Sequence, residues 1–297
     1  MSDDLIHAPA QYQAAFQKSP GYWSGVMRRF RRDPVAMIAL CVVLALILMA
    51  VFAPLVAPAD PYRASMLRRL RPIGTEGFPL GTDELGRDML SRLIYGGRLS
   101  LLMGVTPVFI AFLIGSVIGI TAGYLGGKVN SVLMRTIDVF FAFPSVLLAI
   151  ALSGALGAGI FNGLLSLTVV FIPPIARIAE SVTTAVRRIE YVEAARASGA
   201  SSFTIVRVHV LGNVIGPVFV YATGLISVSL ILASGLSFLG LGVKPPEPEW
   251  GLMLNTLRNA IYVQPWVAAL PGLMIFITSI SFNLLSDGLR SAMDLKS

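Results

Sequence analysis

The sequence predicts an all-α polytopic membrane protein with six transmembrane helices. Of its 297 residues, 55% are hydrophobic and only 13% are charged, and the mean hydropathy is +0.77. A soluble domain of this size needs more polar surface than that composition supplies. Five long stretches contain no charged residue, and one of them is long enough for two crossings at about 20 residues each.

The chain begins with a polar segment that ends in the basic run Arg28-Arg29-Phe30-Arg31-Arg32. We expect residues 1–34 to form a cytoplasmic tail, because Lys and Arg collect on the cytoplasmic side of membrane proteins. The segment has no short apolar core followed by a small-residue cleavage site, so we predict no removable signal peptide. Residues 35–97 are expected to form the first span and an extracytoplasmic segment.

The predicted extracytoplasmic segment contains seven arginines between Asp60 and Arg98, counting Arg98 itself, which runs against the positive-inside rule. We nevertheless place this segment outside, because each span carries the chain to the other side of the membrane and the later spans alternate correctly only from that side. Its motif Gly81-Thr82-Asp83-Glu84-Leu85-Gly86-Arg87-Asp88 predicts a turn. Residues 89–95 then predict an amphipathic helix on the membrane surface. We expect the motif to have a structural role rather than to contact a substrate.

A core of five spans is expected over residues 98–288. The first of these spans carries glycines at four-residue spacing, a stripe that lets another helix pack closely in lipid. These glycines are Gly115, Gly119, Gly123 and Gly127.

The longest uncharged stretch, residues 139–176, accommodates two spans joined by a glycine-rich hairpin. Arg135 and Asp138 are three residues apart on one predicted helix face, which favours an ion pair within the helix. Arg177 and Glu180 have the same spacing and can pair in the same way. We expect these charges to lie near the ends of their spans.

A proline cluster near the end of the chain, Pro245-Pro246-Glu247-Pro248, predicts an outer loop, because no transmembrane helix can carry it. The uncharged stretch 259–286 that follows supplies the sixth span. Residues 289–297 are then expected to form a second cytoplasmic tail.

A polar interval over about 186–207 predicts a cytoplasmic loop between two spans. Its residues favour a short helix over 187–198, which Gly199 stops by adopting a positive φ. Ser201 or Ser202 can then cap a second helix that continues into the next span.

The first helix of this loop has small side chains that let a partner surface approach closely. Ala194, Ala195 and Ala197 keep one side low, while Glu193 and Arg196 offer charges at its rim. The interval therefore predicts a docking element.

The residues Glu193-Ala194-Ala195, followed at the right spacing by Gly199, resemble the cytoplasmic coupling loop of ABC importer permeases. His209-Val210-Leu211-Gly212-Asn213 is similar to the His-x-Leu-Pro-Asn of the peptide-permease branch, with Gly212 in place of the proline. Two further motifs resemble the C-type subunits of peptide and nickel importers, and the resemblance extends over about residues 28–296. These motifs are Gly81–Asp88, and Ser237–Gly242 with Pro245–Gly251.

This resemblance implies a type I (MetI-like) importer permease fold in a bacterial inner membrane, with both termini cytoplasmic. It implies a transport subunit rather than an enzyme, which forms half of a pathway with a homologous B-type permease. Two cytoplasmic ATPases, which hold ATP and Mg²⁺, would dock on the coupling loop, and an extracytoplasmic solute-binding protein would deliver the substrate. The residues implied in coupling are Glu193, Ala194, Ala195, Arg196, Gly199, Ser202 and His209.

The substrate implied by the resemblance is a di- or oligopeptide, with nickel, glutathione or a glycoside as alternatives within the family. An alternative of another class is an ion-coupled secondary transporter, which is expected to carry ionisable groups near the bilayer midplane. The net charge of +7 is explained by cytoplasmic loops, so we expect no nucleic-acid partner.

Catalytic and metal sites are not expected in this chain. Its single cysteine, Cys41, lies in an apolar run, and its two histidines, His7 and His209, lie in a tail and at a helix entrance. The sequence has no His-Glu-x-x-His, so an intramembrane metalloprotease is excluded. Gly127-Lys128 lacks the rest of a phosphate-binding loop, so ATP must bind to another chain.

Overall fold

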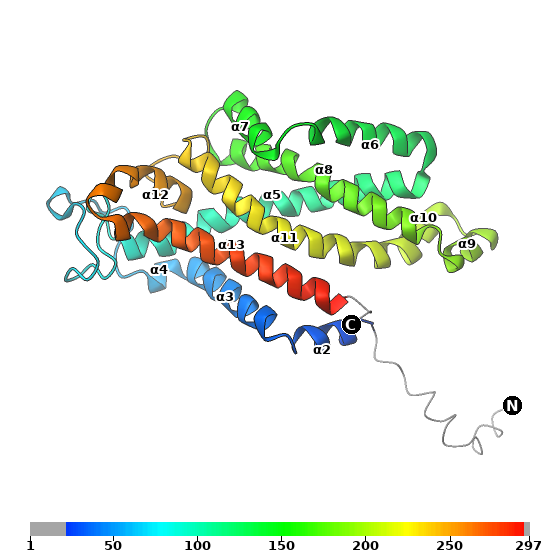
Figure 1. Ribbon diagram of the computed structural model, residues 1–297, viewed down its shortest axis with the longest axis horizontal. Helices are drawn as coiled ribbons and strands as arrows, with labels where there is room; N and C mark the ends of the chain where they lie inside the picture. The colour runs from blue at the N-terminus through cyan, green and yellow to red at the C-terminus, as the bar shows by residue number, and fades with distance from the viewer. Residues whose placement is uncertain (1–21, 294–297) are drawn as a thin grey trace, which may run out of the picture.

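The computed structural model describes residues 22–293, and long helices running side by side dominate it (Figure 1). The long helices are α3 (Pro34–Val51), α5 (Met89–Leu125), α6 (Gly127–Phe141), α7 (Ser145–Leu156), α8 (Ile160–Val186), α11 (Leu211–Phe238) and α13 (Pro265–Met293). The short ones are α2 (Tyr22–Phe30), α4 (Ala53–Val56), α9 (Glu190–Ala197), α10 (Ser202–Ile205) and α12 (Trp250–Thr256).

Five helices are long and apolar enough to cross a membrane: α3, α5, α8, α13 and the continuous helix from α10 through α11. The helices α6 and α7 are bent by 86° at the break between them, and counted as one broken span they bring the number of candidate spans to six. The prediction of an all-α protein with six spans is therefore confirmed. Residues 1–21 of the predicted tail, including His7, and residues 294–297 lie outside the described residues.

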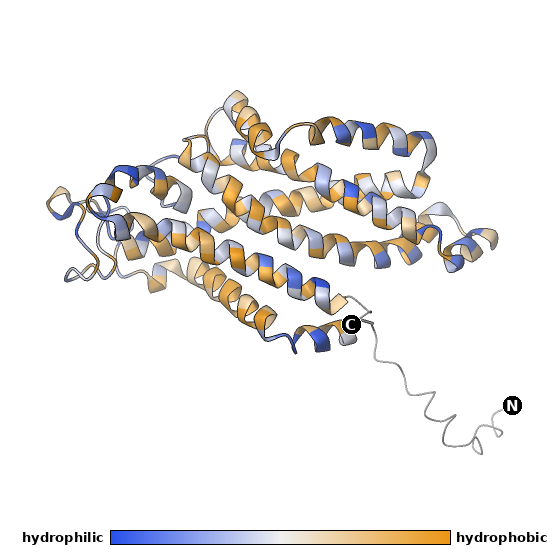
Figure 2. Ribbon diagram, viewed as in Figure 1, coloured by the Kyte–Doolittle hydropathy of each residue, from blue (hydrophilic) through white to orange (hydrophobic). Residues whose placement is uncertain are grey.

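The spans give the molecule two polar ends, which we call the α9 end and the α12 end (Figures 1 and 2). The start of α6 lies towards the α9 end, and the segment 57–88 lies at the α12 end. The helix α2 and the last turn of α13 also lie towards the α9 end, where Arg29 Nε donates a hydrogen bond to the Ala292 carbonyl (2.7 Å).

The predicted surface helix over residues 89–95 is instead the first part of α5. The side chain of Asp88 accepts a hydrogen bond from the Ser91 N–H (2.8 Å) and so caps a helix that continues to Leu125. Gly96 and Gly97 stay helical because the fully buried ring of Trp250 packs against them. The prediction of a separate amphipathic helix was wrong because this tertiary contact is invisible in the local sequence.

The glycine stripe packs α5 against α8, as the spacing predicts for its first three members. A methyl group on Gly115 would lie 3.0 Å from the Ile172 carbonyl oxygen, and one on Gly123 would lie 2.7 Å from the Glu180 carbonyl oxygen. Gly119 meets the backbone of Ala176 even more closely. Gly127 does not belong to the stripe, because it starts α6 with a φ of +52° and a methyl group placed on it would meet no atom within 4 Å.

The third predicted span is broken into α6 and α7. Pro144 has no N–H to donate, and it also disfavours the helical conformation at the residue before it, Phe143. The chain therefore turns between Phe141 and Ser145. The prolines Pro173 and Pro174, by contrast, are accommodated inside the continuous helix α8.

The two predicted ion pairs within helices are wrong. Asp138 of α6 pairs with Arg177 of α8, so the bridge joins two helices. Glu180 instead accepts hydrogen bonds from Asn130 (2.7 Å) and Thr184 (3.2 Å). Arg177 is nine residues from the end of α8, so its charge does not lie at the end of the span.

Two arginines at the α12 end, Arg87 and Arg92, are held by partners inside the fold, whereas Arg63, Arg68, Arg69 and Arg71 are exposed. Asp83 accepts hydrogen bonds from the N–H groups of Leu85 and Arg87 (2.9 Å each) and pairs with the side chains of Arg87 (2.7 Å) and Arg92 (3.3 Å). Arg92 also donates to the Pro61 carbonyl (3.0 Å). Arg87 and Arg92 are buried, so they act as ties within the fold and present little free charge. This agrees with the structural role expected for the motif.

Two further contacts join the α12 end to the spans. The Glu249 carboxylate caps α12 by accepting from the N–H groups of Gly251 (2.9 Å) and Leu252 (2.8 Å), and the Ser100 hydroxyl donates to it (3.0 Å). Burial raises the pKa of the Glu249 carboxyl. Trp250 Nε1 donates to the Leu93 carbonyl (2.9 Å), so the outer loop is fixed onto α5.

Labelling from one side of the membrane should distinguish the two ends. In a Cys41→Ser background, a thiol reagent that cannot cross the membrane should label Glu76→Cys and Lys244→Cys in intact cells, because both residues are exposed at the α12 end. Ser198→Cys, exposed at the α9 end, should react only after permeabilisation. Protection of Glu76→Cys would show that the arginine-rich segment is not extracytoplasmic.

The glycine stripe gives a prediction about stability. Gly119→Ala should lower the unfolding free energy of the purified protein by about 1–3 kcal/mol, because its methyl group would overlap the backbone of α8. The matched control is Gly235→Ala in α11, where nothing lies within 4 Å and alanine favours the helix. Thermal unfolding in detergent measures both; equal midpoints for the two variants would contradict the packing argument.

Candidate functional site

The α9 loop is built from a short helix whose two faces differ. Val192 is fully buried and Ala195 packs partly against the core, so this face is turned towards the body of the protein. Glu190, Glu193 and Ala194, with Ala197 one turn further on, are exposed. Positions three and four apart share one helix face, so these residues form a continuous exposed face. We call these four residues the α9 face.

The end of α9 is fixed by Gly199. Its φ of +85° confirms the predicted left-handed conformation, and the Ala200 N–H donates to the Ala195 carbonyl (3.1 Å) across it. No atom lies within 4 Å of the position where a side chain on Gly199 would begin, so the backbone angle alone disfavours other residues there. Ser201 rather than Ser202 caps the next helix, because its hydroxyl accepts the Thr204 N–H (3.2 Å).

The loop is tied to the span that follows it by Tyr191. The Asn213 side chain donates to the Tyr191 hydroxyl (3.0 Å), and the rings of Tyr191 and His209 lie 5.8 Å apart. His209 lies in a π-helical segment, Val206–Val210, that joins α10 to α11 without a break. Sequence reasoning missed Val192 and Tyr191, and it did not predict the contact of Asn213 with Tyr191. For Val192 the available signal was its apolar side chain between Glu190 and Glu193.

The seven predicted coupling residues are therefore brought into one region, but in different environments. Ala194 lies on the α9 face with Glu193, and Arg196 and Ser202 are also exposed. Ala195 faces the body of the protein, and His209 is half-buried beside Tyr191. The region offers a rigid, low surface with two carboxylates at its edge.

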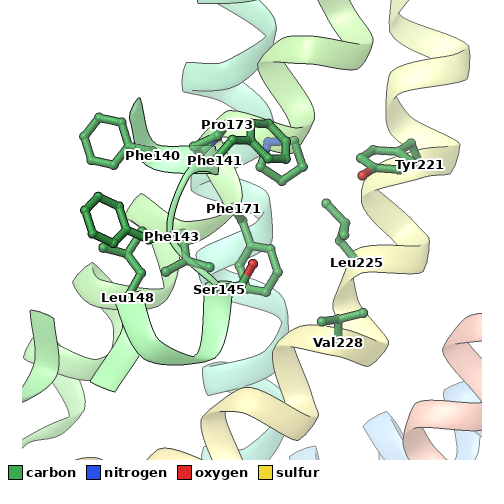
Figure 3. A pocket seen from close by; sticks show the side chains of 12 residues that line it. Phe140, Phe141, Phe143, Ser145, Leu148, Phe171, Pro173, Tyr221, Leu225 and Val228 are labelled. Carbon is green, nitrogen blue, oxygen red and sulfur yellow. The ribbon is translucent and has the colours of Figure 1, made fainter. Parts of the chain in front are cut away.

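A second candidate region is a cavity of about 240 Å³ at the break between α6 and α7. Its wall is strongly aromatic, and Tyr221, Leu225 and Val228 of α11 face the broken span across it (Figure 3). Phe141 lies beside Pro173 at one end of the cavity, and Phe171 lies below them. A largely apolar wall with a few polar groups is typical of sites for small molecules.

This arrangement of broken and continuous spans with a docking loop defines a membrane transport subunit, and comparisons with known proteins agree. The chain belongs to the family described as "Binding-protein-dependent transport system inner membrane component", whose model matches residues 115–296. Residues 21–72 match the N-terminal transmembrane domain of oligopeptide transport permease C. The chain is thus a multi-pass component of an ABC importer and not an enzyme, and this assignment sets aside the ion-coupled secondary transporter.

Similar curated proteins carry the name glutathione transport system permease protein GsiD. The protein of Pectobacterium atrosepticum is 41% identical over 92% of this chain and 91% of its own length. That of Escherichia coli O6:K15:H31 is 43% identical over 92% of this chain and 90% of its own. The fold resembles that of the inward-facing MetNI methionine ABC transporter, with a TM-score of 0.55 and 21% identity over 69% of this chain and 97% of that one.

Proposed function

We propose that this chain is the C-type permease subunit of an ATP-driven importer for glutathione or a closely related short peptide. The observation that carries the proposal is its identity of 41–43%, over nearly the whole length, to proteins named as glutathione permeases. The motifs in the sequence favour di- and oligopeptides in general. Glutathione is a tripeptide, so the names of these relatives narrow the proposed substrate from short peptides in general to glutathione.

We infer that the chain forms half of the pathway with a homologous B-type permease. The support is α6, where only Met134 and Ile137 are buried among its fifteen residues. Its exposed surface mixes large apolar side chains with Arg135 and Asp138. Charges of this kind are costly against lipid, so a second protein surface or a water-filled path is expected to cover them.

We further infer that two cytoplasmic ATPases, which bind ATP and Mg²⁺, dock on the α9 face. The support is its position at the end of the molecule where the basic residues of α2 and the last turn of α13 also lie. Both termini are then cytoplasmic, with tails over about 1–34 and 289–297. A solute-binding protein is expected at the opposite, α12 end, where Trp266 is 77% exposed.

The proposal is tested by uptake into vesicles. The chain should be reconstituted with its partner permease, ATPases and solute-binding protein, and the entry of labelled glutathione measured with and without internal ATP. Uptake that needs ATP and is inhibited by unlabelled glutathione is the expected result. Uptake of a dipeptide or of nickel but not of glutathione would contradict the substrate, and uptake without ATP would contradict the class.

The coupling role is tested by substitutions in the α9 loop. Gly199→Val should reduce ATP-driven uptake at least tenfold, because a β-branched residue at this φ costs on the order of 1–2 kcal/mol and redirects α9. Ala194→Trp should do the same by holding the ATPase away from the α9 face. Insertion and pairing with the second permease should be unchanged.

The matched controls are Gly199→Asn, which tolerates the left-handed conformation, and Ala194→Ser, which stays small. Both should retain uptake close to that of the wild type. Co-purification of the ATPases is the second readout. If Gly199→Val and Ala194→Trp both transported normally, the α9 loop would not be the coupling element.

A further inference from the structure

The ion pair between Asp138 and Arg177 has an unusual position for two charges in a membrane protein. Arg177 is nine residues before the end of α8, or about 14 Å at 1.5 Å per residue, and Asp138 is in the middle of the broken span. Both side chains are about half exposed, at 42% and 53%. Both residues therefore lie inside helices that are candidate membrane spans, and the pair is covered by neither α6 nor α8.

Such a pair cannot face lipid without a large cost, since even paired charges need polar surroundings. It must face either water in the transport pathway or a partner surface. The cavity at the break between α6 and α7 favours the pathway, because residues one helical turn from the pair line it.

The helix geometry fixes the order of the pair and the cavity. Asp138 is one turn before Phe141 on α6, and Arg177 is one turn after Pro173 and Pro174 on α8, and all three of those neighbours line the cavity. The helix α6 runs away from the α9 end and α8 runs towards it (Figure 1). The ion pair therefore lies one helical turn beyond the cavity lining, on the side of the α9 end.

The wall opposite the broken span offers one further polar group. Tyr221 points its hydroxyl across the cavity towards Phe141 and Pro173 (Figure 3). Within residues 22–293 this hydroxyl has no hydrogen-bond partner, so it is free to bind a ligand. The cavity thus combines an aromatic wall with one hydroxyl, and the ion pair lies one helical turn beyond it.

We propose that Arg177 binds the C-terminal carboxylate of the transported peptide, and that Asp138 is its partner in the absence of substrate. This inference rests on the proposed function, because it names the group of the peptide that this chain recognises. The planar guanidinium binds carboxylates through two parallel hydrogen bonds. A substrate carboxylate that enters the cavity replaces the carboxylate of Asp138, so the number of ion pairs at Arg177 stays constant.

The exchange has a mechanical result. In the described state the pair is the salt bridge that joins α6 to α8 on this side of the cavity. When the substrate takes Arg177, that bridge is lost, while the hydrogen bond from Asn130 to Glu180 (2.7 Å) still holds the start of α6 to α8. The end of α6 near Phe141 can then move away from α8, so arrival of a carboxylate is linked to widening of the cavity at the break between α6 and α7.

The experiment compares a free acid with its amide in the reconstituted importer. The probes are labelled glutathione and its derivative in which the glycine carboxylate is a carboxamide, each measured at saturating solute-binding protein. Because the same binding protein serves every permease variant, a change in the ratio of the two uptake rates arises in this chain. The wild type should favour the acid, and Arg177→Gln should reduce acid uptake at least tenfold while changing amide uptake less than twofold.

A charge swap separates recognition from packing. The double variant Asp138→Arg with Arg177→Asp keeps an ion pair between α6 and α8 but exchanges the two charges between the helices. It should therefore assemble and bind the ATPases as the wild type does. It should still fail to favour the acid, because the cation now stands on α6. Arg177→Lys, which keeps the charge but not the planar fork, should retain part of the preference.

Three outcomes would overturn the inference. In the first, the charge-swapped variant again prefers the acid. In the second, Arg177→Gln lowers acid and amide uptake equally, and the charge swap restores both. In the third, the wild type transports both probes equally. The first two would show that the pair serves only to pack α6, against α8 or against the partner permease. A wild type that takes up neither probe would overturn the proposed function, and the inference with it.

Discussion

The close approach of α5 to α8 is the constraint on which the other helices depend. Gly115, Gly119 and Gly123 bring the two backbones together, and no larger residue fits at these positions. In lipid this packing supplies the association energy, because apolar side chains gain little by leaving hydrocarbon for protein. The tight pair then provides the wall against which α6, α11 and the α9 loop are placed.

The sequence predicts the elements of this fold well, because the signals are local. Uncharged stretches predict the spans, and Gly199 and Ser201 predict the turn of the α9 loop. The pairing of Asp138 with Arg177 could not be predicted, since it depends on how two helices far apart in sequence are packed. The predicted docking side of α9 included Ala195, which instead packs partly against the core beside the buried Val192, because burial on this helix is set by tertiary contacts.

At the α12 end, three of the seven arginines from Asp60 to Arg98 are bound to partners within the fold. The positive-inside rule concerns free charges that interact with the membrane during insertion. Arg98 donates to the carbonyls of Ala50 (2.7 Å) and Val51 (2.8 Å), which end α3, and Arg87 and Arg92 are paired with Asp83. Once folded, these arginines complete the hydrogen bonding of helix ends and turns.

The π-helical segment Val206–Val210 gives the helix between the α9 loop and α11 a compliance that its flanks do not have. A π turn holds one more residue than an α turn and has less favourable hydrogen-bond geometry, so it bends and twists more readily than the helix on either side. Under the proposed coupling role, a movement of the α9 face would pass through this compliant segment before it reached α11. The side chains Tyr221, Leu225 and Val228 of α11 form one wall of the cavity, so the segment is the joint between the two regions.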